Sequence, residues 1–381
     1  MKSLKKFLIL SLVFLFMAPL FVGCGSNKVT ITYSHIAENG LVLENLPKGY
    51  KVKIDKDSLF TGLEETNGLM PVEYRVYSST TEYKNLYLNQ KITENVSITV
   101  VWNNSTYNQA EYQNFDKIIN KIKTLEEISL RYNQEKGSTE DANLRVLKYI
   151  KEVRYNGIAW NVLVGSLDSD FIQYVKDNQP SDMDLSSLQQ TEFLTDPKTK
   201  ENVDFLHMIA VVNVILKCGF ENYTNVDLAS WGGDICQLAI QLKRTGLSGS
   251  ALQAKADELF NGDANSSFSR YDVLANVDAF NIANLYFNLG NSTISSVLEQ
   301  YYKLSSTHYR NTIYLQKALP EIYENNEICV TKDEFKQILI SRVDNNNLIN
   351  FWSTTLGESY STLTEQVRVS VNSFADYYYM R

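Results

Sequence analysis

The chain has 381 residues, of which 44% are hydrophobic and 21% are charged, and its formal net charge is −8. This composition is that of a globular protein, so it argues against wholesale disorder and against a polytopic membrane protein. The acidic balance, with no basic patch along the sequence, argues against nucleic acid as a partner. A chain of this length is expected to hold two folded units and a leader.

The first 24 residues have the three-part layout of a secretory signal. Three lysines at positions 2, 5 and 6 precede an apolar stretch over residues 7–16, and small residues precede Cys24. The stretch is too short and wrongly flanked for a permanent membrane-spanning helix. Residues 21–24, Phe-Val-Gly-Cys, resemble the lipobox of bacterial lipoproteins. An ordinary secretory signal with a chance cysteine is the alternative.

The lipobox resemblance implies cleavage before Cys24 and diacylation of this cysteine. Residues 1–23 would then be the signal peptide and residues 24–28 a lipidated tether. Each acyl methylene that enters the bilayer contributes ~0.8 kcal/mol, so palmitate-type chains would hold the protein firmly. We therefore expect a membrane partner, through lipid on Cys24, and a location on the extracytoplasmic face of the cell membrane.

Residues 29–103 alternate between apolar and polar side chains, which is typical of β-strands with one buried face. The alternating segments are 29–36, 49–54, 72–79 and 95–102, and turn sequences such as Asn39-Gly40 and Asn67-Gly68 separate them. The last segment and its preceding polar turn, KITENVSITVVW, resemble the end of an internalin-type B repeat, a β-grasp-like module of cell-surface proteins. The resemblance implies a spacer or adhesive module. A generic small β-domain is the alternative.

From residue 104 to residue 381 the apolar residues recur every three or four positions, as in amphipathic helices. The first such series comprises Phe115, Ile118, Ile119, Ile122, Leu125 and Ile128. Similar series cover residues 140–153, 158–177, 202–218, 227–244, 250–260, 270–289, 292–304, 308–324, 331–343, 345–356 and 359–379. The sequence thus predicts a multidomain α and β protein, with a small β-rich, β-grasp-like domain followed by a large all-α domain.

One helical segment is apolar nearly all round, from residue 203 to residue 216, so it should be the buried central helix. Asp204 and His207 lie three residues apart at its start and therefore share a face. Two interpretations remain open. Asp204 could favour the positive end of the helix while His207 makes a core hydrogen bond, or the two could work as an acid–base pair.

The segment 227–244 carries an apolar stripe and, beside it, a polar stripe. The apolar stripe comprises Leu228, Trp231, Ile235, Leu238 and Leu242, and the polar stripe comprises Asp227, Ser230, Asp234, Gln237 and Gln241. Gly232 and Gly233 fall inside the predicted helix, where glycine costs about 1 kcal/mol relative to alanine. Either another helix crosses closely there or a ligand approaches the backbone, and close packing is the commoner cause.

The predicted helix at residues 270–289 follows Ser269, which with Asp272 resembles a capping box. Its later polar residues, Asp278, Asn281, Asn284 and Asn288, share one helical face. A row of an acid and amides could bind a sugar or a cation, but we expect a solvated face. The three cysteines beyond the leader, Cys218, Cys236 and Cys329, are expected to be small buried residues, with a Cys218–Cys236 bridge as the alternative.

Phosphate-binding glycine loops, HExxH, GxSxG and paired CxxC motifs are all absent from the sequence, so no cofactor and no metal site is predicted. If an active site exists, we expect it where His207, Asp204, Asp227 and Asp234 converge. A carboxylate beside the imidazole suits general acid–base chemistry, and two carboxylates suit glycoside cleavage. Ser230, Trp231, Asp278 and Asn281 are the candidate binding residues.

These observations favour a membrane-anchored cell-surface lipoprotein whose helical domain binds a partner or acts as a scaffold. The partner would be a cell-wall glycan or a surface protein. The alternative is a cell-envelope hydrolase acting on peptidoglycan or another glycan through the His207 cluster, which anchoring would keep near its substrate. A transporter's substrate-binding lipoprotein is disfavoured, because those proteins alternate strands with helices.

Overall fold

The computed structural model describes residues 28–379, except residues 38–41, 65, 78–82, 87–90, 105–108, 152–157, 198–200, 263–267, 291, 305–309 and 325–326. The predicted signal, the tether up to residue 27 and the Asn39-Gly40 turn therefore lie outside the described residues. The described residues form two compact units, one within residues 1–105 and the other within residues 106–381.

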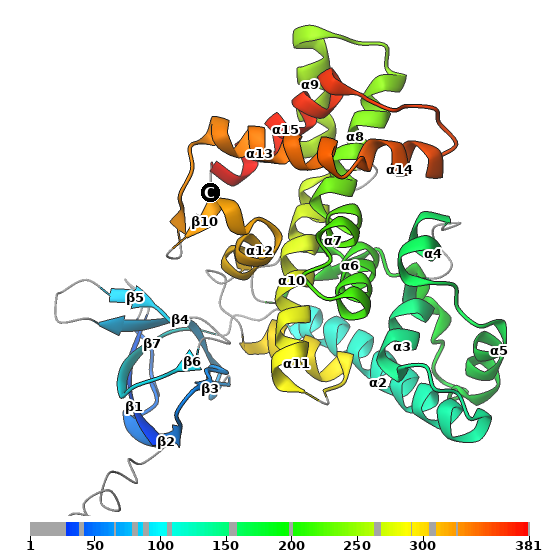
Figure 1. Cartoon of the computed structure of the whole chain (residues 1–381). Helices are drawn as coiled ribbons and strands as arrows, with labels where there is room; N and C mark the ends of the chain where they lie inside the picture. Colours follow the sequence, from blue (N-terminus) through cyan, green and yellow to red (C-terminus); the bar gives the residue numbers. More distant parts are fainter. Residues whose placement is uncertain are drawn as a thin grey trace, which may run out of the picture. The chain divides into compact units, whose positions relative to one another are not determined.

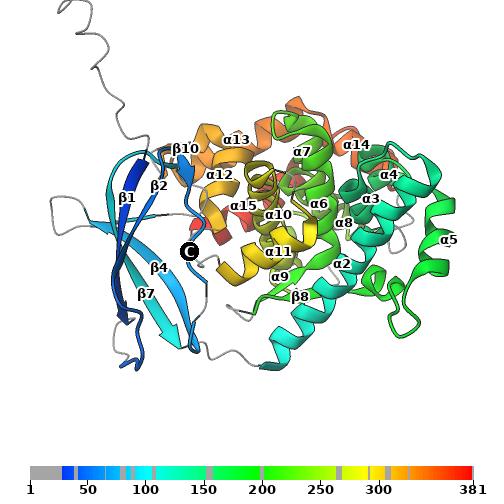
Figure 2. The same ribbon diagram turned by 90° about the horizontal axis from the view of Figure 1, so that it is seen from below.

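The N-terminal unit is built on a mixed five-stranded sheet with the order β2-β1-β7-β4-β5. Figure 2 labels β1, β2, β4 and β7 of this sheet. Its strands are β1 (Lys28–Ala37), β2 (Tyr50–Asp55), β4 (Leu69–Tyr77), β5 (Tyr83–Asn85) and β7 (Val96–Asn104). The first strand and the last, β1 and β7, pair in parallel, and all other pairs in this sheet are antiparallel. β3 (Ser58–Leu59) and β6 (Lys91–Ile92) form a separate antiparallel pair. The prediction of a small strand-rich region is confirmed.

The alternation of β1 explains how the sheet buries one face. Val29, Ile31 and Tyr33 are buried on that face, whereas Ser34 lies on the other and its hydroxyl contacts that of Thr99 at 2.8 Å. Such a hydroxyl pair satisfies both groups where the sheet meets water. The described turn Asn67-Gly68 has φ angles of 52° and 73°, the left-handed conformation that Asn-Gly favours in tight hairpins.

The C-terminal unit is helical. Its α-helices are α2 (Gln109–Lys136), α3 (Ala142–Lys151), α4 (Ile158–Val164), α5 (Ser169–Asn178), α6 (Phe205–Cys218), α7 (Tyr223–Ala229), α8 (Trp231–Arg244), α9 (Gly249–Asn261), α10 (Arg270–Leu289), α11 (Ile294–Leu304), α12 (Arg310–Ala318), α13 (Lys332–Asn345), α14 (Leu348–Thr355) and α15 (Thr364–Tyr379). Two short 3-10 helices, η2 (Ser186–Gln190) and η4 (Pro320–Ile322), accompany them. The prediction of a large helical domain after a strand-rich region is confirmed.

The expectation that this domain would be purely α is corrected by two short antiparallel strand pairs. β8 (Phe193–Thr195) pairs with β9 (Asn202–Asp204), and β10 (Tyr323–Glu324) pairs with β11 (Glu327–Ile328). Strands of two or three residues are too short to show a period of two, so the sequence pattern could not reveal them.

Three of the predicted helices are interrupted. The segment 158–177 forms α4 and α5, because Gly165 adopts a φ of 87° and Asp168 caps a new helix. The segment 227–244 forms α7 and α8, with Ser230 at the junction between them. The segment 308–324 leaves the α conformation after Ala318, and Pro320 begins a 3-10 turn.

The helix α6 is the centre of the core, as its apolar composition predicted. Its residues from Phe205 to Ile215 are all buried. It contacts α3, α7 and α10, and Figure 1 shows α6, α7 and α10 running beside one another. A second group of helices packs together and lies above α6 and α11 in Figure 1. It comprises α8, α9, α13, α14 and α15.

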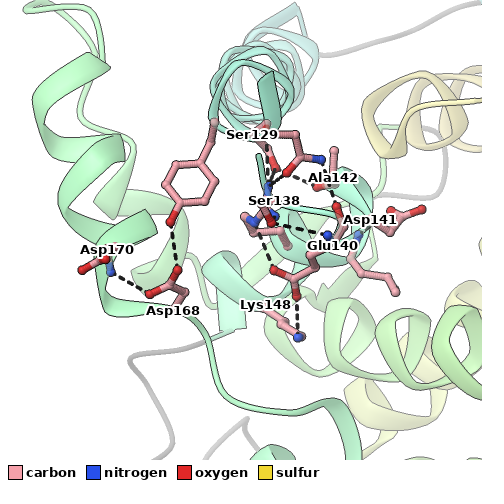
Figure 3. A network of polar contacts seen from close by, with 12 residues as sticks. Ser129, Ser138, Glu140, Asp141, Ala142, Lys148, Asp168 and Asp170 are labelled. Carbon is pink, nitrogen blue, oxygen red and sulfur yellow. Dashed lines mark hydrogen bonds and ion pairs between the residues drawn. The ribbon is translucent and has the colours of Figure 1, made fainter. Parts of the chain in front are cut away.

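A buried guanidinium fixes the turn between α2 and α3. Arg145 is fully buried; its Nε donates to Glu140 Oε2 at 3.0 Å and its Nη2 to Ser138 Oγ at 2.6 Å. Glu140 also binds Lys148 at 2.7 Å, and Ser138, Glu140 and Lys148 lie together in Figure 3. The rings of Tyr132 and of Phe171 in α5 stack against the guanidinium. The cation thereby links α2, α3 and α5.

Candidate functional site: a buried acid–histidine cluster

The cluster begins at the first turn of α6, where Asp204 is the N-cap. Its Oδ1 accepts a hydrogen bond from the backbone N–H of His207 at 2.8 Å. The carboxylate therefore satisfies a backbone donor that the helix itself leaves unbonded and complements the positive end of the helix. This contact shows the structural role that the sequence analysis considered for Asp204.

The imidazole of His207 points to residues of α8 and α10. Its Nε2 lies 2.9 Å from Asn276 Oδ1, and Asn276 Nδ2 donates to Asp234 Oδ2 at 2.6 Å. Asp234 Oδ2 itself lies 3.7 Å from Nε2. Since the Asn276 amide donates to the carboxylate through its nitrogen, its oxygen faces the imidazole and requires a proton on Nε2. The Asn276 amide thus links the imidazole of His207 to the carboxylate of Asp234 through two hydrogen bonds.

A second carboxylate faces the opposite ring nitrogen. Asp272 Oδ1 lies 3.9 Å from His207 Nδ1. Its other oxygen, Oδ2, accepts from the backbone N–H of Ser269 at 2.7 Å and from the Ser269 hydroxyl at 3.0 Å. The capping box predicted for Ser269 and Asp272 is therefore present at the start of α10. The same aspartate contributes charge to the histidine cluster.

The electrostatics follow from this arrangement. Burial by itself lowers the pKa of His207, but Asp234, Asp272 and Asp204 together raise it above its usual value. Burial raises the pKa of Asp234 to about 7, although the histidine opposes the shift. Burial likewise raises the pKa of Asp272. The helices α6, α8 and α10 therefore enclose three groups whose pKa values are all raised.

The cluster is closed rather than open. The side chain of His207 is 9% exposed and that of Asp234 is 2% exposed. An imidazole whose Nε2 is bound to an amide and whose carboxylates lie within the core is positioned to hold protons and to join helices. A general acid or base must in contrast reach a substrate.

Asp227 does not join this cluster. It is fully buried at the end of α7, where its Oδ1 accepts from Trp231 Nε1 at 2.9 Å and from Arg342 Nη2 at 2.8 Å. Burial raises the pKa of this carboxyl to about 6, although Arg342 opposes the shift. The predicted convergence of all four catalytic candidates is therefore corrected. Asp227 pairs with an arginine from α13, and the other three meet at the start of α6.

The two neighbouring binding candidates also have core contacts. Trp231 is fully buried and Arg342 lies over its ring at 5.2 Å, so Trp231 is no open stacking wall for a ligand. Ser230 is fully buried too and donates to the carbonyl of Val226 at 2.6 Å. Both residues serve the junction between α7 and α8.

The paired glycines lie in the first turn of α8, not in a helix interior as expected. A Cβ on Gly232 would come within 2.6 Å of Leu348 Cδ1, and one on Gly233 would lie 2.8 Å from Trp352 Nε1 and overlap the carbonyl oxygen of Leu228. Leu348 and Trp352 belong to α14. Close approach of another helix, the commoner of the two expected causes, is therefore the one that the structure shows.

The polar row on α10 is largely buried, which corrects the expectation of a solvated face. Asp278 is fully buried and accepts from the hydroxyls of Tyr301 at 2.5 Å and Tyr302 at 2.7 Å, both on α11. Asn281 is 6% exposed, and its Nδ2 donates to the carbonyl of Val277 at 2.8 Å. Phenol donors satisfy the carboxylate where the sequence pattern had suggested water.

Sequence reasoning missed Asn276 and Arg342 as members of these clusters. Asn276 lies on a helix rich in amides, and nothing in its spacing distinguishes it from its neighbours. Arg342 lies 115 residues beyond its partner Asp227, so only the tertiary fold brings the two together. An arginine among apolar helix positions at 338–343 was the one available signal.

Three cysteines lie beyond the predicted leader. Cys218, Cys236 and Cys329 are free, so the alternative of a Cys218–Cys236 bridge is wrong. Cys236 is buried as expected, whereas Cys329 is exposed. Among the described residues, no group of three or more His, Cys, Asp or Glu side chains is arranged to hold a metal ion.

No helix in the described part of the chain has the length and apolar character needed to cross a membrane.

Comparison with known proteins gives one family. A family model described as YkzU uncharacterised protein matches residues 209–356, which is less than half of the chain. The matched segment runs from α6 to α14 and includes Asp227, Arg342 and the glycines of α8. No match was found among curated proteins or among solved structures.

Proposed function

We propose that this protein is a lipoprotein anchored to the extracytoplasmic face of the cell membrane by lipid on Cys24, and that its helical domain is a binding or scaffold domain. The lipobox-like residues 21–24 support the anchor. The closed position of His207, with a side chain 9% exposed, is the observation that favours binding over catalysis. A partner on the cell surface, either a cell-wall glycan or a surface protein, fits an anchored domain of this kind.

We further propose that the N-terminal unit is a β-grasp-like spacer. Two observations support this. The first and last strands pair in parallel at the centre of a mixed sheet, with β2 and β4 on their outer sides. The last strand ends near Trp102, whose Nε1 donates to His35 Nδ1 at 2.9 Å and joins the two central strands. A rigid module at this place would separate the helical domain from the membrane.

The anchor is tested by replacing its cysteine. In a bacterial host, Cys24→Ser should abolish labelling by radioactive palmitate and move the protein from the membrane fraction to the soluble fraction. Cys329→Ser is the matched control, since Cys329 is an exposed free cysteine and its loss should change neither result. A Cys24→Ser protein that stays in the membrane fraction would contradict the anchor.

The choice between binding and catalysis is tested on isolated cell walls. The purified chain is incubated with labelled peptidoglycan, and we measure both co-sedimentation and the release of soluble fragments. Co-sedimentation without release is expected for a glycan partner. If the protein instead binds only cell envelopes that retain their surface proteins, a protein partner is indicated. Release that disappears in His207→Gln would overturn the proposal in favour of the hydrolase.

A further inference from the structure

The cluster around His207 joins three helices that are far apart in the sequence. His207 lies on α6, Asp234 on α8, and Asp272 and Asn276 on α10. α6 and α10 are also among the helices in closest contact within this unit. Side chains from all three helices thus meet around a single imidazole.

Among the described residues, the titratable groups that contact the two ring nitrogens of His207 most closely are acidic. Asp234 lies 3.7 Å from Nε2, Asp272 lies 3.9 Å from Nδ1, and Asp204 caps the same helix turn through the backbone N–H of His207. Asn276 supplies the neutral contact. Among these groups, the protonated imidazole is the positive charge that balances the carboxylates. Loss of its proton would leave buried negative charges close to one another.

We propose that this cluster is a proton-dependent lock that holds α6, α8 and α10 together in mildly acidic conditions and weakens as the pH rises through neutrality. The role goes beyond anchoring or binding, because it makes the strength of the helical core depend on the surrounding pH.

The sign of the effect follows from linkage. A group whose pKa is higher in the folded than in the unfolded state binds more protons when folded, so its contribution to stability is lost as the pH rises through the folded pKa. The pKa of His207 is raised by its carboxylates, which outweigh burial, and burial raises the pKa of Asp234 to about 7. Both groups therefore act in the same direction.

The first test follows the histidine itself. The chain has three histidines, His35, His207 and His308, so ring signals of histidine-labelled full-length protein in detergent micelles can be assigned with His35→Gln and His308→Gln. The His207 signal should titrate above the usual value of about 6.5. His35 should titrate below it, because burial lowers its pKa. A His207 midpoint at or below the usual value would overturn the lock.

The second test measures thermal unfolding of the same protein by far-UV circular dichroism from pH 5.5 to pH 8.5. Asp234→Asn removes one of the groups whose pKa is raised and keeps the size of the side chain. We expect the difference in midpoint between wild type and variant to change by about 3 °C or more across this range, with the wild type relatively weaker at high pH. Parallel pH profiles for the two proteins would contradict the proposal. Ala251→Gly, which changes no titratable group at an exposed position of α9, is the control, and its pH profile should parallel that of the wild type.

Discussion

Asp227 and Arg342 form a two-point ion pair between α7 and α13: Arg342 Nε and Nη2 both approach Asp227 Oδ2, at 3.1 and 2.8 Å. Nη2 also lies 2.8 Å from Oδ1. The carboxylate is fully buried, and the arginine side chain is 15% exposed. Arg342 in addition donates to the carbonyl of Ala318, through Nη1 at 2.5 Å. The pair therefore connects the start of the family-matched segment with its end.

Asp227→Asn should destabilise the helical domain by about 2 to 3 kcal/mol, because Arg342 would lose its buried charged partner and keep only the more exposed Glu321, 3.2 Å away. Urea unfolding followed by circular dichroism measures the change. Glu358→Gln is the matched control, since Glu358 pairs with Arg244, whose side chain is 52% exposed, and should cost well under 1 kcal/mol. An equal loss of unfolding free energy in the two variants would contradict the role assigned to Asp227.

Gly233→Ala should destabilise the protein by about 3 kcal/mol, because the added methyl group would overlap the carbonyl of Leu228 and press on Trp352. The free energy of unfolding in urea gives the value. Ala251→Gly, at an exposed position of α9, is the converse control and should cost about 1 kcal/mol through helix propensity alone. A neutral Gly233→Ala would show that α14 does not press on this turn.

Arg145→Met should cost about 3 kcal/mol, because Glu140 loses its buried partner and the hydroxyl of Ser138 loses a donor. The turn between α2 and α3 should also become sensitive to protease before the rest of the domain does. Limited proteolysis with mass spectrometry locates the cut. Arg244→Met serves as the exposed control, and cleavage at the same rate in both variants would rule out the role of Arg145.

Tyr301→Phe and Tyr302→Phe should each cost about 2 kcal/mol, since each removes a hydroxyl donor to the buried carboxylate of Asp278. Because both hydroxyls bind the same carboxylate, the cost of the double variant should depart from the sum of the two single costs. Thermal and urea unfolding of the four proteins completes the cycle. Strict additivity would show that the two phenols act independently.

The sequence revealed those features that depend on local periodicity. The alternation in residues 29–36 predicted β1, and the apolar run from residue 203 predicted the buried helix α6. The capping box of Ser269 and Asp272 was also predicted from the sequence, because its two members are only three residues apart.

Contacts between residues that are far apart in the sequence could not be predicted from local periodicity. The polar face of α10 looked solvated because the tyrosines that bind Asp278 belong to another helix. The break at Ser230 was hidden because its helix-like spacing continues across the junction. Helical spacing placed Asp227 and Asp234 on one polar stripe. Because the chain turns between α7 and α8, however, Asp227 binds Arg342 and Asp234 binds Asn276.

The parallel pairing of β1 with β7 has a mechanical consequence. Because the two strands run in the same direction, the start of β1 at Lys28 and the end of β7 at Asn104 lie at opposite ends of the pair. Tension between the proposed N-terminal anchor and the helical domain would enter through these two points and load the hydrogen bonds of the pair in shear. Bonds loaded in this way break together rather than one after another, so the β1–β7 pair would resist separation under such tension.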